Sequence, residues 1–393
     1  MRILHLSHGT LPDWRIEKCA LSARRKLGFE AFFAGLDPII PYIDSSAFQK
    51  IYKIEWNEGA KFGIPLYWNS TKKRLKNILR ESRPDIVHAH NIIAAKMISE
   101  MGMPFVFDDH EYTSVYVRGL AEPVNVQSST SMLRKAKSHF IGSRMKKVAW
   151  NALLKHRAIG LWTRWERELV SSTAPMIVTT KRVSKDLQSR YSNSNINRIF
   201  VVPNFPEQSE TRNLVKPEYH NSLSSSYAGG DWFYSAIPRS HRNLEGLTAL
   251  FLDHDIGNLV MIGVNSDSIS SKIKYMGFLP RNDMYNEMFK HSIGLMAFRK
   301  HWSHQFKSPN KAYEYAHAGL YVISTSSFSS VIESFSGNCG VFDDYADLAS
   351  LLVYYKENPD ELYTKRLKSF EYARKNLIWE NYEKNIFRAY QLA

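Results

Sequence analysis

Cysteine is almost absent from this chain. Cys19 and Cys339 are the only two among 393 residues, and neither lies in a Cys-x-x-Cys pair or in a cluster with histidine. Such isolated cysteines exclude a disulfide framework and a zinc knuckle, because both need several closely spaced sulfur ligands. We therefore expect a protein of a reducing, cytoplasmic compartment.

Long apolar runs are missing as well. No stretch of about 18 uninterrupted apolar residues occurs, so a membrane-spanning helix is not expected. The apolar run Met1–Ser7 is too short for a signal peptide. Glycine (19 residues) and proline (15 residues) are too scarce for a fibrous or low-complexity chain. With 44% apolar residues, a chain of 393 residues predicts two ordinary globular domains.

Acidic residues are outnumbered by basic ones. The 52 Lys and Arg against 38 Asp and Glu give a net charge of +14. This excess favours an anionic partner, which could be nucleic acid, an acidic membrane surface or a phosphorylated substrate. Much of it lies in residues 134–167, where Glu166 is the only acid and Trp150, Trp162 and Trp165 are interleaved with Lys and Arg.

Two structures would suit this basic segment. Trp and Leu on one side of a helix with Lys and Arg on the other are typical of helices that lie in the interface of an anionic membrane. A helix packed on the core with a solvated basic face would have the same composition. Nucleic acid is the weakest candidate, because no RNP-like, zinc-finger or helix-turn-helix motif accompanies the charge. No specific nucleic-acid partner is expected.

Short β-rich runs alternate with helical patterns along nearly the whole chain, which is typical of an α/β fold with parallel sheets and crossover helices. The first series of strands is predicted at 3–7, 30–34, 51–56, 85–90, 104–108, 176–180 and 199–202. The second series is predicted at 232–235, 259–263, 273–276, 293–298, 321–324 and 340–342. The serine- and glycine-rich stretch 211–231 between the two series is the preferred linker.

A stretch in the C-terminal third predicts a helix with a recognisable start and end. Ser308 can cap the free N–H groups of a helix that begins at Pro309, and Gly319 supplies the left-handed residue that ends it. Helix starts attract anions, and Lys307 and Lys311 add positive charge to this one.

One turn further along, Glu314 lies near the face that carries Asn310 and Lys311. Its carboxylate could accept hydrogen bonds from two neighbouring sugar hydroxyls. A phosphate at the helix start and a ribose one turn deeper would together bind a nucleotide-activated sugar. An ordinary capped amphipathic helix would carry the same residues, so these residues alone leave both interpretations open.

In open parallel sheets, ligands bind beyond the carboxyl ends of the strands, and only a limited set of residues follows a predicted strand here. These segments are 7–15, 88–91, 108–112, Asn204, 236–242, Gly263 and 299–311. Two sheets with such edges would form a cleft between the domains, where small-molecule sites tend to occur.

Taken together, several of these segments resemble the GT-B glycosyltransferases, in particular the retaining family-4-type enzymes that use a nucleotide-activated sugar. The similar segments follow the family's order and cover most of the chain: Pro84–His90, Phe107–Glu111, Val201–Asn204, Tyr275–Pro280 and Ser308–Leu320. The motif Ser-Pro-Asn-Lys-x-x-Glu-Tyr in the last of these segments looks closest to that of transferases that build surface polysaccharides and lipid-linked glycans.

The resemblance implies an α/β fold of the GT-B type, with two Rossmann-like domains whose parallel sheets face a central cleft. The implied parts are an acceptor domain at 1–207, a nucleotide-sugar-binding domain at 208–375 and a C-terminal helix at 376–393 that packs back on the first domain. On the donor side, Glu314 would hold the ribose and the backbone N–H groups of Ser308–Lys311 would hold the diphosphate. Arg242 would neutralise the charge on the departing diphosphate.

On the acceptor side, His110 aligns with a histidine that lies near the reacting sugar in relatives, and Asp108 and Asp109 precede it. A buried aspartate or histidine within reach of an acceptor hydroxyl could take its proton. Alternatively, Asp108 could cap the following helix, and His88 and His90 are more often structural than catalytic.

The sequence also departs from the family's pattern. Phe306 stands where many relatives have a second glutamate, so Lys307 or His304 would have to contribute at the transferred sugar instead. Ser235–Ala236 replaces a usual Gly-Arg pair, which leaves Arg239 as a substitute for the missing charge. A non-catalytic copy of the fold is therefore one alternative.

No metal ion is expected. The Asp253–Asp255 tripeptide has the Asp-x-Asp spacing of the metal site in another transferase architecture, but a surface turn between a helix and a strand explains it better. In the architecture that the resemblance implies, Arg, Lys and helix dipoles can stabilise the departing diphosphate without a metal.

We therefore expect a cytoplasmic glycosyltransferase on the inner face of the cell membrane. It would transfer a sugar from a nucleotide diphosphate to a lipid-linked or polysaccharide acceptor with retention, using the nucleotide sugar as co-substrate and no other cofactor. Residues 134–167 would contact the anionic membrane. The alternatives are a sugar-nucleotide epimerase of similar fold and a non-catalytic peripheral membrane protein.

Overall fold

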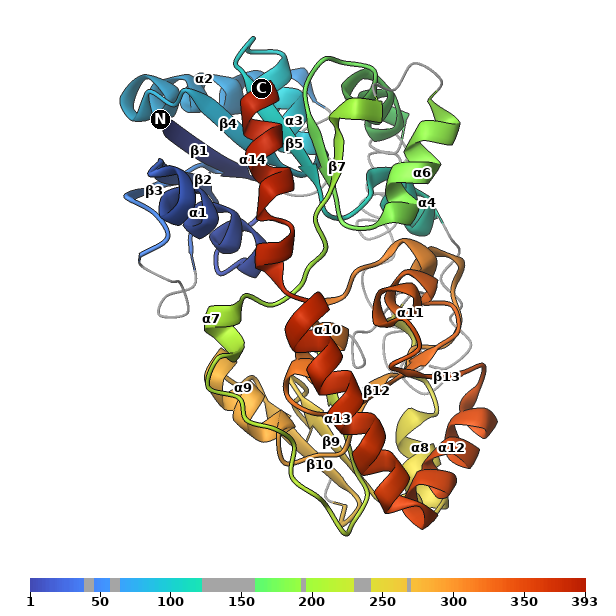
Figure 1. Ribbon diagram of the computed structural model, residues 1–393. Coiled ribbons are helices and arrows are strands. Elements are labelled where there is room, and N and C mark those ends of the chain that lie inside the picture. The colour runs from blue at the N-terminus through green and yellow to red at the C-terminus, as the bar shows by residue number, and fades with distance from the viewer. Residues whose placement is uncertain (39–45, 57–63, 122–159, 192–195, 230–241, 267–269) are drawn as a thin grey trace, which may run out of the picture. The chain divides into compact units, whose positions relative to one another are not determined.

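The computed structural model describes the chain except for residues 39–45, 57–63, 122–159, 192–195, 230–241 and 267–269 (Figure 1). The chain divides into two compact units. The N-terminal unit comprises Met1–Val202 together with Glu383–Ala393, and the C-terminal unit comprises Pro203–Tyr382. The last helix thus belongs to the unit in which the chain began.

The N-terminal unit is built on a seven-stranded sheet with the order β3-β2-β1-β4-β5-β6-β7. All neighbouring strands are parallel. The strands are β1 (Arg2–Ser7), β2 (Glu30–Gly35), β3 (Lys50–Lys53), β4 (Ile86–His90), β5 (Phe105–Asp109), β6 (Met176–Val178) and β7 (Ile199–Val201). The chain reverses its direction across the sheet between β1 and β4, the place where open α/β sheets bind ligands.

Helices cover both faces of this sheet, as a parallel sheet requires. They are α1 (Trp14–Leu27), α2 (Pro65–Ser82), α3 (Asn91–Ser99), α4 (Thr113–Ala121), α6 (Lys181–Arg190) and α14 (Glu383–Leu392). Right-handed crossovers place α1 and α3 on opposite faces, because β1 to β2 and β4 to β5 run in opposite directions across the sheet. Helix α14 packs on β5, β6 and β7 and contacts α1 (Figure 1).

The C-terminal unit has a six-stranded parallel sheet with the order β10-β9-β8-β11-β12-β13. Its strands are β8 (Ser224–Ala228), β9 (Asn258–Ile262), β10 (Ile273–Gly277), β11 (Ile293–Met296), β12 (Tyr321–Thr325) and β13 (Gly340–Phe342). Here the direction reverses between β8 and β11, so both units have the same doubly wound plan.

The helices of this unit are α7 (Gln208–Thr211), α8 (Leu247–Asp253), α9 (Arg281–Met288), α10 (Asn310–His317), α11 (Ser329–Phe335), α12 (Tyr345–Glu357) and α13 (Pro359–Asn376). Short 3₁₀ turns lie at Trp302–Phe306 and Trp379–Asn381 in this unit and at Ile196–Arg198 in the N-terminal unit. Helix α10 packs on β11, β12 and α13. The Asp253–Asp255 tripeptide lies at the exposed end of α8, which confirms the prediction of a surface turn.

Most predicted strands lie where the sequence placed them, but the linker prediction is wrong in part. Strand β8 lies within 211–231 and occupies the centre of its sheet. Ser225 and Ser226 are fully buried there, although serine-rich sequence usually indicates a turn. The strand predicted at 232–235 lies outside the described residues. The boundaries of the units fall at 202/203 and 382/383 rather than at 207/208 and 375/376.

The start of α10 also differs from the prediction. Its N-cap is Pro309, and no side chain caps the helix, because the Ser308 hydroxyl is used elsewhere. The predicted end is confirmed. Gly319 has φ +77°, and the N–H groups of Gly319 and Leu320 donate to the carbonyls of Ala316 and Tyr315, the hydrogen-bond pair of a Schellman motif.

The basic segment 134–167 lies mostly outside the described residues. Its described end belongs to a helical stretch at 160–170. Trp165 is buried in that stretch and its ring lies 5.2 Å from that of Trp68 on α2. This tryptophan therefore serves the protein core. Among the described helices, none has the length and apolar character needed to cross a membrane.

We expect Gly319→Ala to destabilise the C-terminal unit more than Gly337→Ala. Both glycines have positive φ, which costs about 1 to 2 kcal/mol for a residue with Cβ. A Cβ on Gly319 would also lie 2.8 Å from Pro217 Cβ, whereas a Cβ on Gly337 meets nothing within 4 Å. Overpacking adds about 1 to 3 kcal/mol. Urea unfolding measures both variants, and equal losses would contradict the contribution of Pro217.

Candidate functional site

The first candidate group lies at the start of α10 in the C-terminal unit. We call it the α10 cluster, formed by Tyr227, Gly229, Arg242, Arg281, Phe298, Lys311 and Glu314. The carboxyl ends of the neighbouring parallel strands β8 and β11 share one edge of the sheet. Lys311 Nζ lies at this edge, 4.2 Å from the ring centre of Tyr227 and 5.0 Å from that of Phe298. The planes of the two rings meet at 87°, so the amine lies in the corner between them, within cation–π distance of both.

Glu314 is buried one turn further along α10. Its Oε1 lies 3.1 Å from Nη1 of Arg281, the first residue of α9. The other end of this guanidinium pairs with Glu210 on α7. Burial alone would lower the pKa of Arg281, but Tyr285 and the two carboxylates outweigh it and raise that pKa. Arg281 therefore stays charged and fixes the orientation of the Glu314 carboxylate.

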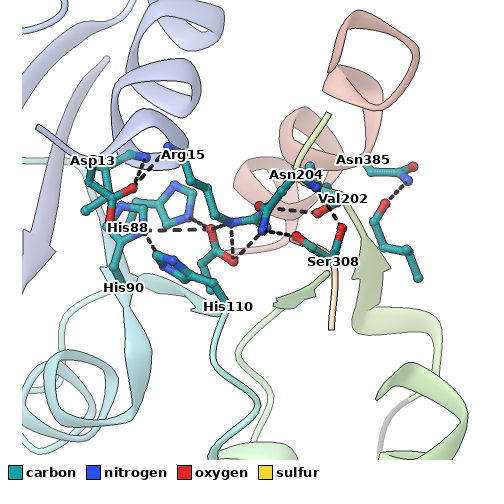
Figure 2. Close-up of polar contacts among 12 residues, drawn as sticks. Asp13, Arg15, His88, His90, His110, Val202, Asn204, Ser308 and Asn385 are labelled. Carbon is teal, nitrogen blue, oxygen red and sulfur yellow. Dashed lines mark hydrogen bonds and ion pairs between the residues drawn. The ribbon is translucent and has the colours of Figure 1, made fainter. Parts of the chain in front are cut away.

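The other residues predicted around α10 have mixed surroundings. Ser308 is buried, and its hydroxyl accepts from the backbone N–H of Asn204 at 3.2 Å (Figure 2). The same hydroxyl donates to the Tyr313 hydroxyl at 3.3 Å. Lys307 and Asn310 are partly exposed on either side of the turn that leads into the helix. Because its hydroxyl is engaged internally, Ser308 has only its backbone to offer a ligand.

Arg242 and Arg239 were both predicted to bind a diphosphate. Arg242 is described, and its charge acts on both Lys311 and Tyr227, which places it in the α10 cluster. Arg239 lies outside the described residues. His304 is buried, with Nδ1 2.8 Å from the Ser327 hydroxyl and its ring stacked 4.0 Å from that of Phe328. Its surroundings are those of a structural histidine.

The second candidate group lies in the N-terminal unit, where β1, β4 and β5 end. We call it the β5 cluster, formed by Arg15, His88, His90, Asp108 and His110; Figure 2 labels the arginine and the three histidines. Arg15 Nε and Nη2 both donate to the Asp108 carboxylate at 2.9 Å, and Nη1 donates to the carbonyl of Val202 at 2.9 Å. The side chains of Arg15 and Asp108 are only 5% and 0% exposed. This is a bidentate, fully desolvated ion pair.

The local sequence explains how Arg15 reaches this position. Asp13 is the N-cap of α1, and its carboxylate accepts from the backbone N–H groups of Arg15 and Ile16. The Glu17 carboxylate in turn accepts from the N–H of Asp13 at 2.9 Å. This reciprocal capping fixes the first turn of α1 and therefore the direction of Arg15.

Three imidazoles of the N-terminal unit form a hydrogen-bonded row. His5 Nδ1 lies 3.0 Å from His90 Nε2, and His90 Nδ1 lies 3.2 Å from His110 Nε2. Burial lowers the pKa of His5 and His90, and the neighbouring histidines lower it further. His5 and His90 are therefore neutral, and in each contact one ring donates while the other accepts.

His88 connects the β5 cluster to the last helix of the chain. Its Nδ1 lies 2.8 Å from the hydroxyl of Tyr390 on α14, and its Nε2 lies 3.4 Å from Asp108 Oδ2. Asp108 is buried, which opposes ionisation, but the charge of Arg15 and the nearby histidines hold its pKa well below the usual range. Asp108 is therefore an ionised anchor and a weak base.

Asp109, the next residue, is used differently. Its carboxylate accepts from the backbone N–H of Thr113 at 3.2 Å and from the Thr113 hydroxyl at 3.3 Å, at the start of α4. Burial, followed by the charge of the nearby Glu166, raises the pKa of Asp109 to about 8. The helix-capping alternative raised for Asp108 thus applies to Asp109, which is mostly protonated near neutral pH.

Several buried groups here could in principle hold a metal ion, among them His5, His88 and His90. However, the rings of His88 and His90 are stacked, with centres 4.3 Å apart and planes 15° apart, so their in-plane lone pairs run nearly parallel. A zinc-like ion needs nitrogen ligands that converge at about 2.0 Å. The geometry of His5, His88 and His90 therefore fits a hydrogen-bonded network better than a metal site, and metal independence stays a prediction.

Two arginines in these clusters were not predicted as site residues. Arg15 lies in a segment that follows β1, so the strand-end rule pointed to its region but not to its partner, 93 residues away. Arg281 follows Pro280 at the start of a helix, where a charged residue is usually exposed. Nothing in the local sequence indicates that either guanidinium is buried, because burial depends on the elements packed around it.

Comparison with solved structures extends this picture. The chain is similar to sucrose-phosphate synthase from Thermosynechococcus elongatus (TM-score 0.66, 12% identity, covering 99% of this chain and 98% of that one). It is also similar to Anabaena HepE in complex with UDP and glucose (TM-score 0.65, 11% identity, covering 100% of this chain and 99% of that one). A third similar structure is a putative UDP-N-acetylglucosamine 2-epimerase from Listeria monocytogenes (TM-score 0.58, 11% identity, covering 99% of this chain and 95% of that one).

Neither a protein-family model nor a curated protein sequence matches the chain. The structural similarities nevertheless extend over nearly its whole length. Together with the two doubly wound parallel sheets, they confirm an α/β fold of the GT-B type.

We expect Arg15→Met to destabilise the N-terminal unit by about 3 to 5 kcal/mol at neutral pH, because it leaves the buried Asp108 charge without its partner. Arg74→Met is the matched control. Arg74 lies on α2 of the same unit and pairs with Glu55 at 2.9 Å, but the two side chains are 51% and 65% exposed, so its loss should cost at most about 1 kcal/mol. Chemical unfolding measures both, and equally small losses would refute the anchoring role of Arg15.

Proposed function

We propose that the protein is a retaining, family-4-type glycosyltransferase that uses a nucleotide-diphosphate sugar. The observation that carries this proposal is the α10 cluster. There a helix start, Lys311 and Arg242 provide positive charge one turn from the fixed carboxylate of Glu314. The GT-B fold supports it, since HepE, a protein of similar structure, is described in complex with UDP and glucose.

In this proposal the α10 cluster binds the donor. The first backbone N–H groups of a helix have no partner within the helix, and they would hold the diphosphate together with Lys307, Asn310 and Lys311. Glu314 would accept hydrogen bonds from the ribose hydroxyls. Arg242 would stabilise the departing diphosphate, an interaction that strengthens as negative charge develops in the transition state.

The β5 cluster would position the acceptor. His110 is the partly exposed end of the imidazole row, so it is our candidate for contact with the acceptor hydroxyl. Asp108 would act indirectly as a positioning residue, by anchoring His88 through its carboxylate. Asp109 would support the fold through α4. These assignments follow from basicity and exposure, because an ion-paired Asp108 and a capping Asp109 are poor proton acceptors.

The acceptor that we propose is lipid-linked or polysaccharide. Its support is the resemblance of the α10 sequence to transferases of such glycans, together with the net charge of +14. An anionic membrane surface would attract such a chain. We accordingly propose a cytoplasmic enzyme at the inner face of the membrane that needs no metal and no cofactor beyond the nucleotide sugar.

A sugar-nucleotide epimerase is the second candidate, favoured by the structural similarity to a putative epimerase. Incubation with UDP-glucose or GDP-mannose alone separates the two activities. A transferase without its acceptor should release free sugar slowly by hydrolysis, and the sugar should keep its anomeric configuration. NMR of the products makes the distinction. An epimerised nucleotide sugar would overturn the transferase proposal.

We expect Glu314→Ala to weaken donor binding by about 1 to 3 kcal/mol, because it leaves the ribose hydroxyls without their acceptor. The measurement is calorimetry, with whichever of UDP-glucose and GDP-mannose raises the melting temperature more. Glu210→Ala is the matched control, since it also removes one carboxylate from Arg281 but has no proposed contact with the donor. Equal losses of affinity in both variants would argue against a ribose contact.

A further inference from the structure

The amine of Lys311 has an unusual environment for a lysine. It lies against the rings of Tyr227 and Phe298, in the corner that these two nearly perpendicular rings form. A Cβ added to Gly229 would come within 2.6 Å of Lys311 Nζ and 2.5 Å of the Tyr227 hydroxyl. The backbone of Gly229, which carries no side chain, therefore covers a third side of the amine. Lys311 as a whole stays partly exposed, but these contacts displace part of the water around its amine, and water stabilises an ammonium better than aromatic faces do.

The charges around Lys311 do not stabilise its ammonium form in place of that water. Arg242 is a second cation nearby and disfavours a charged amine, whereas Glu314 favours it. The Glu314 carboxylate lies 3.1 Å from Arg281, so Arg281 already compensates part of its negative charge and less of it acts on Lys311. Tyr227 is buried, which raises its pKa and keeps the phenol neutral. The start of α10 adds further positive potential.

We propose that Lys311 takes up a proton from solvent when a diphosphate binds beside it, so that donor binding is coupled to protonation of this one side chain. The inference rests on the proposed function. In the empty site, burial and then Arg242 lower the pKa of Lys311 to about 7. A bound diphosphate brings negative charge next to the amine and reverses the balance in favour of the ammonium.

The coupling has a defined sign. Protonated Lys311 binds the diphosphate more tightly, so affinity is highest below the pKa of the empty site. Affinity should then fall by up to about tenfold per pH unit as the pH rises from 7 towards the higher pKa of the complex. A nucleotide sugar is a suitable probe, because neither of its two phosphates titrates near neutral pH.

Calorimetry of UDP-glucose or GDP-mannose binding at pH 8, in buffers of different ionisation enthalpy, measures the protons exchanged. The expected result is uptake approaching one proton, and affinity that falls between pH 7 and 9. Lys311→Met should bind more weakly, with no proton uptake and a flat pH dependence. Lys368→Met, at an exposed position on α13, should behave as the unchanged protein.

Carbon-13 NMR of labelled lysine provides a second measurement, with the Lys311 signal assigned by its loss in Lys311→Met. Its titration midpoint should lie near pH 7 in the empty protein and move upward by more than one unit with bound donor. Donor binding without proton uptake, or a midpoint above about pH 9 in the empty protein, would overturn the inference and leave the proposed function standing. Failure of every nucleotide sugar to bind would overturn both.

Discussion

The parallel direction of the strands is the constraint on which the rest of the structure depends. In a parallel sheet every carboxyl end lies at the same edge, and the crossover helices begin there. The β5 cluster lies at such an edge in the N-terminal unit, where β1, β4 and β5 end. The α10 cluster lies at the corresponding edge in the C-terminal unit, beside β8 and β11. Charged and polar side chains collect at both edges because the strands themselves are buried.

Arginines hold the carboxylates at these edges in place. Arg15 keeps Asp108 ionised, and Arg281 pairs with both Glu314 and Glu210. Each guanidinium offers several donors in one plane, so it fixes the orientation of a carboxylate as well as its charge. Lys311 has no comparable partner among the described residues, and this contrast makes it the group whose protonation a ligand can change.

Much of the fold followed from the sequence. Alternating β-rich and helical patterns located every described strand of the N-terminal unit and five of the described strands of the C-terminal unit, because buried parallel strands need continuous apolar runs. The prediction did not locate β8, and this has a physical reason. Ser225 and Ser226 carry no hydrophobic signal, yet their small side chains fit the crowded centre of the sheet. Glu314 and Lys311 could be predicted as donor-side residues because both lie on one helix, and their spacing along it can be read from the local sequence.

The sequence by itself determined most of the strands and the end of α10 at Gly319, since these depend on neighbouring residues and backbone preferences. Only the tertiary structure decided that Ser308 contacts Asn204 instead of capping α10, and that Asp109 rather than Asp108 caps a helix. It also decided that Arg15 and Arg281 are buried partners of Asp108 and Glu314. Those outcomes depend on contacts between residues far apart in the chain, because burial and charge pairing arise only when separate strands and helices pack together.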